Sequence, residues 1–519
     1  MNIATAPLTA TEAPVLRSTI AARLERTPAA IVRDAFPVTK AAAAISSFCA
    51  IAAASFGCTS AAIPSAPGQT AGGTVLVGGD GPSSVLAVSV SPLVLTPSFD
   101  PSIHDYYVRC SSGTNELTLT VTDATGSVST PLSLTEDQLA SVRDTYWIRC
   151  LPSDAPVITV TKGNGGGVPT PGWYLVNSAT YAFVLDTNGT PVWYERGPTV
   201  LNVDSVTSNT ISFVPNSTGA FGTSSATRFE IHSISTLAMD TVQTVGSPTD
   251  AHELRLLANG DHMLLTYPFQ SGVDLTGLQT FGSNETIANC EIQEIDPTGQ
   301  VVWSWLATDH VDPKQESLEP ATNTVNGITV DDVFHCNSIE VDASGNLLLS
   351  MRHANAVFYI NRATGTVEWK LGGASFNKDG ATFIQVVNDP EGTFSTQHDA
   401  RFLPNGDLTL FDDHGASPGL ARGVEYAIDH TAKTATLVFQ FLGATQSEAE
   451  GSFRRYADGH SVIGWGFLPT GQTVLTEIDA NGADVFDVAF SPSGNQSYRA
   501  VKVPLSQLDV TMLRATTAQ

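Results

Sequence analysis

Charged side chains are scarce in this chain of 519 residues, at 15% of the total, and the shortage falls on the basic ones. Lys and Arg number 25 against 51 Asp and Glu, which gives a net charge of −26. An acidic surface repels the phosphate backbone of nucleic acids and the headgroups of anionic lipids. The composition therefore predicts no nucleic-acid partner, while 42% apolar residues suffice for a sizeable core.

Long apolar runs are missing except at 41–57, where weakly apolar residues follow a stretch that carries five basic ones. Such a run is marginal for a membrane span and suits the apolar part of a signal peptide. The letters SFGC that end at Cys58 resemble a bacterial lipoprotein cleavage site. We therefore expect a signal or leader segment at 1–58 with a lipid anchor on Cys58, a flexible tether at 59–79, and export to the periplasm or the cell surface.

Cysteine is scarce as well, with six residues, of which two belong to the leader. Cys110 and Cys150 end two similar strand-like runs, YYVRC and YWIRC. In an exported chain this pattern favours a disulfide between them, with two buried free thiols as the alternative. Cys290 and Cys336 lack the spacing of metal ligands, so we expect both to be core residues.

Helical periodicity is almost absent after the tether. Val, Thr, Ile and Phe recur in short runs between turns, and the chain holds 43 Gly and 29 Pro, which favours strands. The stretch 80–162 alternates apolar and polar residues and predicts a small antiparallel β-sandwich that resembles the cadherin-like modules of exported bacterial proteins. A Gly- and Pro-rich segment at 162–172 then marks a domain boundary.

From residue 168 to the C-terminus, two kinds of hairpin alternate, each in four copies. The second kind has its turn glycines at Gly260, Gly345, Gly406 and Gly459. Alternating hairpins of this kind predict a β-propeller over 168–519, for which six blades suit the length and five or seven are left open. A large jelly-roll or sandwich array is the rival. The predicted fold class is thus all-β: a six-bladed β-propeller preceded by a small antiparallel β-sandwich.

Histidines precede three of the turn glycines at similar distances. His252, His335 and His398 lie 8, 10 and 8 residues ahead of their turns. Equivalent positions of different blades face one another at one end of a propeller channel, so we expect three imidazoles to meet there. Imidazoles serve as metal ligands, proton carriers or nucleophiles.

Arg352 and Asn337 belong to the same predicted cluster, because the hairpin at 335–353 returns to the end at which it began. A fixed guanidinium disfavours a metal ion nearby and matches the oxygens of a sulfate or phosphate group. The chain has no Gly-rich phosphate loop of the nucleotide-binding kind. We therefore expect an anionic tetrahedral substrate, no cofactor and no metal.

Four stretches of the sequence, at 334–373, 395–414, 421–429 and 451–466, closely resemble the arylsulfotransferase family. The ordered combination H-x-N-S, S-x-R-H and Q-H-D-A-R-F carries the resemblance. It implies a six-bladed propeller enzyme that moves a sulfuryl group from an aryl sulfate to a phenol without a nucleotide donor, by ping-pong kinetics. The implied partners are small-molecule phenols and aryl sulfates.

The resemblance also implies roles for individual residues. His398 matches the nucleophile that forms a sulfohistidine, and His335, Asn337 and Arg352 match the residues that hold the sulfuryl oxygens. His252 matches a further active-site histidine. Two other functions are left open: a metal-dependent propeller hydrolase or lyase that uses the same histidines, and a noncatalytic exported binding propeller. A homodimer is also left open.

Some neighbouring polar residues receive other interpretations. We expect His353 and His414 either at the rim of the site or just behind the residues that line it. We expect Arg422 and Glu425 to form a structural ion pair. Strand alternation turns Asp399 away from His398, so we do not expect Asp399 to be the carboxylate that orients this imidazole.

Overall fold

The computed structural model describes residues 74–77, 84–163, 166–415, 418–468, 473–492 and 496–516. The chain divides into two compact units, Met1–Ser65 and Ala66–Gln519, and the first lies outside the described residues. The expected leader at 1–58 and the lipid anchor at Cys58 therefore also lie outside them. Among the described residues, no helix has the length and apolar character needed to cross a membrane.

Two small sheets share one core in the first part of the described chain. The sheets consist of β1 (Thr74–Val77), β6 (Leu139–Val142), β7 (Tyr146–Pro152) and β3 (Asp105–Cys110), and of β2 (Val85–Ser91), β4 (Asn115–Asp123) and β5 (Gly126–Leu134). Buried residues of both sheets form a single cluster, as in a β-sandwich. A disulfide joins Cys110 to Cys150, with Cα atoms 5.5 Å apart, which confirms the expected pairing.

The sandwich differs from the expectation in pairing and in extent. Strand β3 pairs with β7 in parallel, and β1 with β6 in parallel, so a wholly antiparallel domain was wrong. Alternation reports only which face a residue occupies and is the same in both pairings. β1 lies inside the expected tether at 59–79, and β8 (Val157–Lys162), expected in the sandwich, pairs instead with β36 (Asp484–Ser491).

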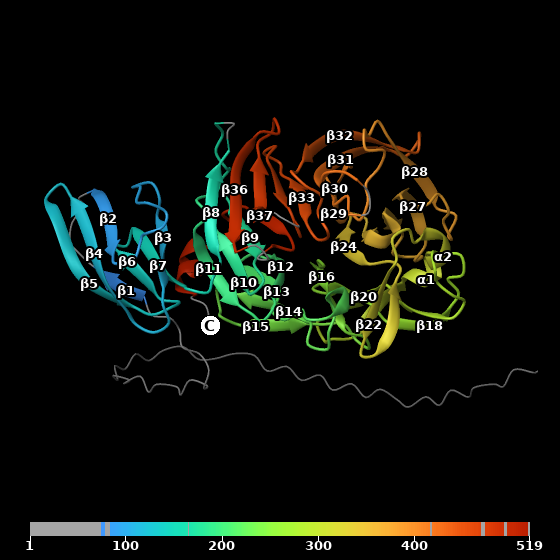
Figure 1. Ribbon diagram of the computed structural model, residues 1–519, viewed down its shortest axis with the longest axis horizontal. Coiled ribbons are helices and arrows are strands. Elements are labelled where there is room, and N and C mark those ends of the chain that lie inside the picture. The colour runs from blue at the N-terminus through green and yellow to red at the C-terminus, as the bar shows by residue number, and fades with distance from the viewer. Residues whose placement is uncertain are drawn as a thin grey trace, which may run out of the picture. The chain divides into compact units, whose positions relative to one another are not determined.

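Six four-stranded antiparallel units follow among the described strands, and Figure 1 shows them in succession from green to red. Their members are β9 (Trp173–Asn177), β10 (Tyr181–Leu185), β11 (Pro191–Arg196) and β37 (Ala500–Val503); β12 (Leu201–Asp204), β13 (Thr210–Val214), β14 (Phe229–Ser233) and β15 (Met239–Val242); β16 (Thr249–Leu256), β17 (His262–Thr266), β20 (Glu291–Ile295) and β21 (Val301–Leu306); β24 (Cys336–Val341), β25 (Leu347–Met351), β26 (Ala356–Ile360) and β27 (Val367–Gly372); β29 (His398–Phe402), β30 (Leu408–Asp412), β31 (Arg422–Asp429) and β32 (Thr434–Leu442); and β33 (Ser452–Arg455), β34 (Ser461–Gly464), β35 (Thr473–Ile478) and β36.

The innermost strands of these units contact one another in chain order. β12 contacts β16, β16 contacts β24, and the contacts continue through β29 and β33 to β37 and back to β12. The C-terminal strand β37 pairs with β9, which closes the ring. This is the arrangement of a β-propeller, and the mostly-β, propeller-like expectation is confirmed.

Further elements connect or decorate the units. β28 (Thr382–Val387) bridges β27 and β32, and β18 (Phe269–Val273), β19 (Glu285–Ala288), β23 (Ile328–Asp332) and β22 (Ala321–Val325) form an additional sheet. The short helices are α1 (Ala307–His310), α2 (Pro313–Glu316) and α3 (Val510–Ala515). Middle strands such as β10 and β30 are buried along their whole length, because neighbouring units cover both of their faces.

The inner strands carry an irregularity where the site begins. In β16, β24 and β29 the register shifts near the first residues of the strand. His335 and Asp399 there have positive φ angles of 50° and 54°. Such bulges re-aim side chains at the rims of sheets and next to active sites. They turn polar residues of three different units toward the axis.

The expectation that Cys290 and Cys336 are core residues is confirmed, since both are fully buried in one hydrophobic cluster. The sequence did not reveal that they form a disulfide, with Cα atoms 6.2 Å apart. The bond joins two neighbouring units across 46 residues of chain, and nothing in the local sequence signals that proximity. It fixes the start of β24, where Cys336 lies between His335 and Asn337.

We expect the double variant Cys290→Ala/Cys336→Ala to lower the free energy of unfolding of the propeller by about 2–4 kcal/mol. Without the disulfide, the unfolded chain has more conformational entropy. Denaturant unfolding monitored by tryptophan fluorescence measures the change. The matched variant Cys110→Ala/Cys150→Ala removes the disulfide of the sandwich and should leave the propeller transition in place. An unchanged propeller transition in the first variant would contradict the prediction.

Candidate active site

Three histidines from three inner strands come together at one end of the propeller axis. His252 lies in β16, His335 precedes β24, and His398 begins β29. The rings of His252 and His335 have their centroids 5.0 Å apart, in an edge-to-face arrangement. Both lie close enough to His398 to influence its pKa electrostatically. The structure therefore brings together the imidazoles that the repeats predicted to meet.

Each of the three imidazoles is held by an aspartate through its Nδ1 atom. The Nδ1-to-oxygen distances are 2.6 Å for His252 with Asp250, 2.5 Å for His335 with Asp332 and 2.7 Å for His398 with Asp413. A carboxylate partner at Nδ1 fixes the orientation of the ring and leaves Nε2 for other partners. None of the three aspartates was predicted from the sequence, although two of them stand two and three residues before their histidine.

His398 has the character of a neutral nucleophile. Its side chain is almost completely buried, and this burial, with the nearby Arg352 guanidinium, holds its pKa well below the usual range. Its Nε2 accepts a hydrogen bond of 3.3 Å from the backbone N–H of Glu450. An atom that accepts an N–H carries a lone pair, so Nδ1 holds the proton and donates it toward Asp413. Burial raises the pKa of Asp413, and the nearby Arg352 guanidinium opposes this shift.

Arg352 contributes the cation of the site from the short 3-10 turn η2 (Arg352–Ala354). Its Nη1 donates to Nε2 of His353 over 2.7 Å, and its Nη2 donates to the carbonyl of Glu448 over 2.9 Å. Its Nε is buried and has no hydrogen-bond partner among the described residues. One N–H of the guanidinium therefore stays available for an anionic ligand.

Of the two positions expected for His353, the structure shows the second: the ring is buried behind Arg352 and does not lie at the rim. Its Nδ1 donates to the backbone carbonyl of Asp332 over 2.7 Å, so its Nε2 can accept from the guanidinium. Burial lowers the pKa of His353 to about 3, which keeps the ring uncharged next to the cation. Asn337 donates to the carbonyl of Gln397 over 2.7 Å and so connects β24 to β29.

Comparison with known protein families shows to which family this chain belongs. The model of the family described as arylsulfotransferase (ASST) matches residues 221–491, which is 271 of 519 residues. The chain belongs to the arylsulfotransferase family. No curated protein matches it. Family membership implies arylsulfotransferase activity, and the matched segment contains every histidine and arginine described above.

Solved structures similar to this arylsulfotransferase family member are distant in sequence. A protein of unknown function from Bacteroides caccae has 11% identity and a TM-score of 0.40, covering 64% of this chain and 99% of its own. A putative 6-phosphogluconolactonase from Bacteroides fragilis has 10% identity and a TM-score of 0.35, covering 64% and 98%. Virginiamycin B lyase from Staphylococcus aureus has 9% identity and a TM-score of 0.28, covering 64% and 99%. Similarities this low carry no functional information.

A buried network of charges lies next to the histidines on the axis. Arg401 donates to Glu253 over 2.6 Å and to Asp399 over 2.7 Å, and Arg454 donates to Asp399 over 3.0 Å. Arg499 pairs with both carboxylates at 3.1 Å. These arginines hold the pKa of Asp399 far below its usual range. Asp399 is thus paired with these arginines and does not orient His398.

The expected ion pair between Arg422 and Glu425 is wrong. Arg422 instead bonds to Asp389 and Asp412, each at 2.8 Å, and Glu425 pairs with Arg455. Residues three apart on a strand point to opposite faces, so the two side chains of β31 cannot meet. Both pairs are structural, and neither touches the three histidines.

A group of Asp332, His335 and His353 offers ligand atoms within 4.8 Å of one another, as a metal ion would need. Both nitrogens of His353 are already engaged, one of them by the Arg352 guanidinium. A fixed cation at that distance opposes the binding of a second cation. The arrangement therefore favours an anion over a metal.

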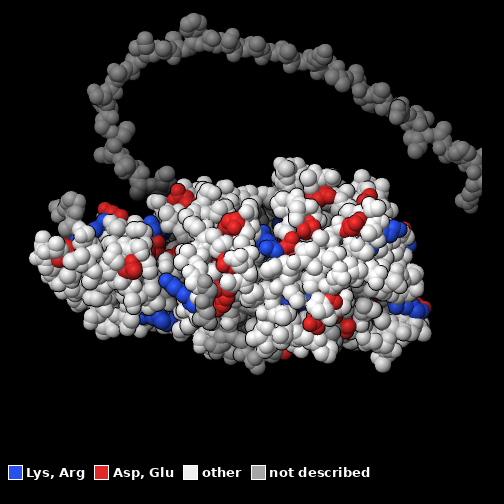
Figure 2. Space-filling model, turned by 90° about the horizontal axis from the view of Figure 1, so that it is seen from above, with Lys and Arg blue, Asp and Glu red and all other residues white. Residues whose placement is uncertain are grey.

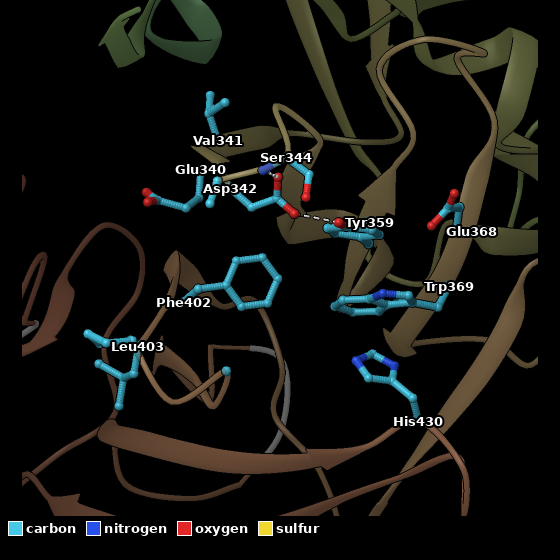
Figure 3. Close-up of a pocket in the computed structure, with 13 residues that line it drawn as sticks. Glu340, Val341, Asp342, Ser344, Tyr359, Glu368, Trp369, Phe402, Leu403 and His430 are labelled. Carbon is cyan, nitrogen blue, oxygen red and sulfur yellow. Dashed lines mark hydrogen bonds between the residues drawn. The ribbon is translucent and has the colours of Figure 1, made fainter. Parts of the chain in front are cut away.

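A separate cavity of about 710 Å³ lies at the turn end of β24 and β29, and Figure 3 shows its lining. Trp369 stacks on Tyr359 with centroids 5.0 Å apart, and His430 lies 5.7 Å away on the same indole. These neighbours cover the faces of the indole. None of the predicted site residues lines this cavity, so it is distinct from the candidate active site.

We expect Asp413→Asn to lower arylsulfotransferase activity by about 10²–10⁴-fold, because the amide no longer selects the tautomer that leaves a lone pair on Nε2 of His398. Steady-state assays with an activated aryl sulfate measure the loss. Asp379→Asn is the matched control, since Asp379 holds Nδ1 of His310 over 2.9 Å at a site away from the three histidines. Equal activities of the two variants would contradict the assignment.

Proposed function

We propose that this protein is an aryl sulfate sulfotransferase with a six-bladed propeller, which moves a sulfuryl group to a phenolic acceptor through a covalent sulfohistidine at His398. One observation carries the proposal: the uncharged Nε2 of His398 and the unpartnered Nε–H of Arg352 belong to the same buried cluster. A nucleophilic lone pair next to a free guanidinium donor suits attack on an anionic sulfate ester.

In the first half-reaction, Nε2 of His398 attacks the sulfur of the aryl sulfate. A nitrogen–sulfur bond forms, the sulfur–oxygen bond to the aryl group breaks, and its electron pair leaves with the phenolate oxygen. Arg352 donates to the sulfuryl oxygens, with His335 beside it, and Asp413 faces the positive charge that develops on the imidazole. Donors fixed in advance give the largest electrostatic gain, since nothing reorganises during the reaction.

In the second half-reaction, the oxygen of an acceptor phenol attacks the same sulfur and the nitrogen–sulfur bond breaks, which restores neutral His398. The acceptor must lose its proton, and His252 and His335 are two candidate bases beside His398. Burial holds the pKa of His335 well below its usual range, so His335 is a weak base for a phenol. The kinetics should be ping-pong, because the first phenol leaves before the second binds.

The other parts of the proposal concern the setting of the enzyme. We propose small-molecule phenols and aryl sulfates as its partners, with no nucleotide donor. Export to the periplasm or cell surface with a lipid anchor at Cys58 suits the leader pattern at 1–58, and two disulfides among the described cysteines suit an oxidising compartment.

Mass spectrometry tests the covalent intermediate. Brief mixing with 4-nitrophenyl sulfate without an acceptor should add the mass of one SO₃ group to the peptide that contains His398. His398→Asn should abolish both the adduct and the burst of 4-nitrophenol. A burst without an adduct at His398 would rule out the proposed intermediate, and a noncatalytic propeller would show neither in the unaltered protein.

Chelation tests the rival metal-dependent function, for which Asp332, His335 and His353 are the observed ligand group. We expect dialysis against EDTA to leave the rate of sulfuryl transfer unchanged, because Arg352 occupies the position that would balance the substrate charge. Loss of activity on dialysis with recovery on addition of one divalent metal per chain would instead support the hydrolase or lyase.

A further inference from the structure

The loop between β32 and β33 covers both central groups of the candidate site. The backbone N–H of Glu450 donates to Nε2 of His398 over 3.3 Å. Two residues earlier, the carbonyl of Glu448 accepts from Nη2 of Arg352 over 2.9 Å. The side chain of Glu450 therefore starts from a backbone that touches the nucleophile, on a segment that also touches the cation.

This segment is held firmly on several sides. Ser447 donates to the carbonyl of Asp413 over 3.0 Å, and Phe467 donates to the carbonyl of Ala449 over 2.8 Å. A Cβ atom at Gly466 would come within 2.5 Å of the carbonyl oxygen of Ala449, so only glycine allows this close approach. Glu450 itself has a left-handed φ of 70°, a conformation that persists at functional sites where the surroundings enforce it.

The carboxyl group of Glu450 lies inside the site. The residue as a whole is partly exposed, but its Oε2 is buried and has no hydrogen-bond partner among the described residues. The carboxyl group of Glu450 interacts electrostatically with His252 from β16 and with Asp413, which follows β30 and also interacts with Arg352. The backbone N–H of Glu450 donates to His398 from β29. Burial raises the pKa of Glu450 to about 7, against a smaller opposing effect of His252.

An unpaired buried carboxyl oxygen is costly, and a catalytic role is one reason for a protein to retain such a group. The free Oε2 of Glu450 can form a hydrogen bond with a proton donor or acceptor that binds next to Nε2 of His398. We propose that Glu450 carries the proton of the phenol oxygen in both half-reactions. This inference rests on the proposed function. It assigns to Glu450 the proton transfer for which His335 is too weak a base.

Glu450 then gives up a proton in the first half-reaction and takes one back in the second. When His398 attacks sulfur and the sulfur–oxygen bond breaks, the carboxylic acid of Glu450 gives its proton to the departing phenolate oxygen. Glu450 is left as a carboxylate beside the sulfated imidazole. The acceptor phenol then gives its proton to that carboxylate while its oxygen attacks sulfur, so Glu450 returns to the acid form as His398 is released.

The test compares two donors in single-turnover experiments on Glu450→Gln. Phenyl sulfate releases a phenol as weakly acidic as tyrosine, with a pKa of ~10, whereas 4-nitrophenyl sulfate releases a far more acidic one. We expect phenol release from phenyl sulfate to slow by about 10²-fold and release from 4-nitrophenyl sulfate to slow only a few-fold, because a good leaving group needs little proton transfer. Glu391→Gln, an exposed glutamate outside the site, is the matched control and should match the unaltered protein.

The pH profile gives a second readout. In the unaltered protein, release from phenyl sulfate should fall above about pH 7, where Glu450 loses its proton, and transfer to an acceptor phenol should fall below it. Glu450→Gln should remove both limbs. Equal losses on the two donors, or no loss on either, would overturn the role of Glu450 while a sulfated His398 still forms. Absence of that adduct in the unaltered protein would instead reject the proposed function itself.

Discussion

Two buried carboxylates and three arginines tie the inner strands together at the axis, and the geometry of the site depends on this network. Glu253 directly follows His252, and Asp399 directly follows His398. Each acid pairs with the arginines, while the preceding imidazole pairs with its own aspartate. Removing one partner would leave an uncompensated buried charge, which typically costs 3–5 kcal/mol. The network therefore anchors two site histidines through their neighbours in sequence.

The arginines near His398 contrast with the negative net charge of the whole chain. The net charge is −26, and on the face drawn in Figure 2 acidic and basic side chains are dispersed among uncharged ones. Inside, Arg352 and Arg499 both act on His398 and disfavour its protonation. The same cations that disfavour protonation of the imidazole also suit the binding of an anion. One set of charges thus favours both a neutral imidazole and an anionic ligand beside it.

Much of the site could be predicted from the sequence because the repeats place His252, His335 and His398 at equivalent positions. The aspartates that hold them were harder to find. Asp413 approaches His398 from the far side of a hairpin, 15 residues away, so no local pattern joins them. The bulges at the strand starts were also hidden, because alternation assumes a regular pleat. Glu450 lies in a loop outside the repeated hairpins, so neither period nor motif pointed to it.

For the fold as well, features that repeat along the sequence could be predicted, and features that do not repeat could not. Turn glycines such as Gly345, with a φ of 82°, recur where the hairpins turn, and these repeats predicted the propeller. Closure was not predictable: β37 returns from the C-terminus to pair with β9, and β8 leaves the sandwich to pair with β36. Both pairings join segments that lie far apart in the sequence, which local patterns cannot encode. The disulfide between Cys290 and Cys336 escaped notice for the same reason.

A crystal structure of the His398→Asn variant with an uncleaved aryl sulfate would test the central claim most directly. The account predicts sulfur about 3–3.5 Å from the side chain at position 398 and a sulfuryl oxygen bonded to Nε–H of Arg352. It also predicts the aryl oxygen next to the carboxyl group of Glu450. A donor bound instead in the cavity beside Trp369, or with its sulfate away from Arg352, would contradict the account.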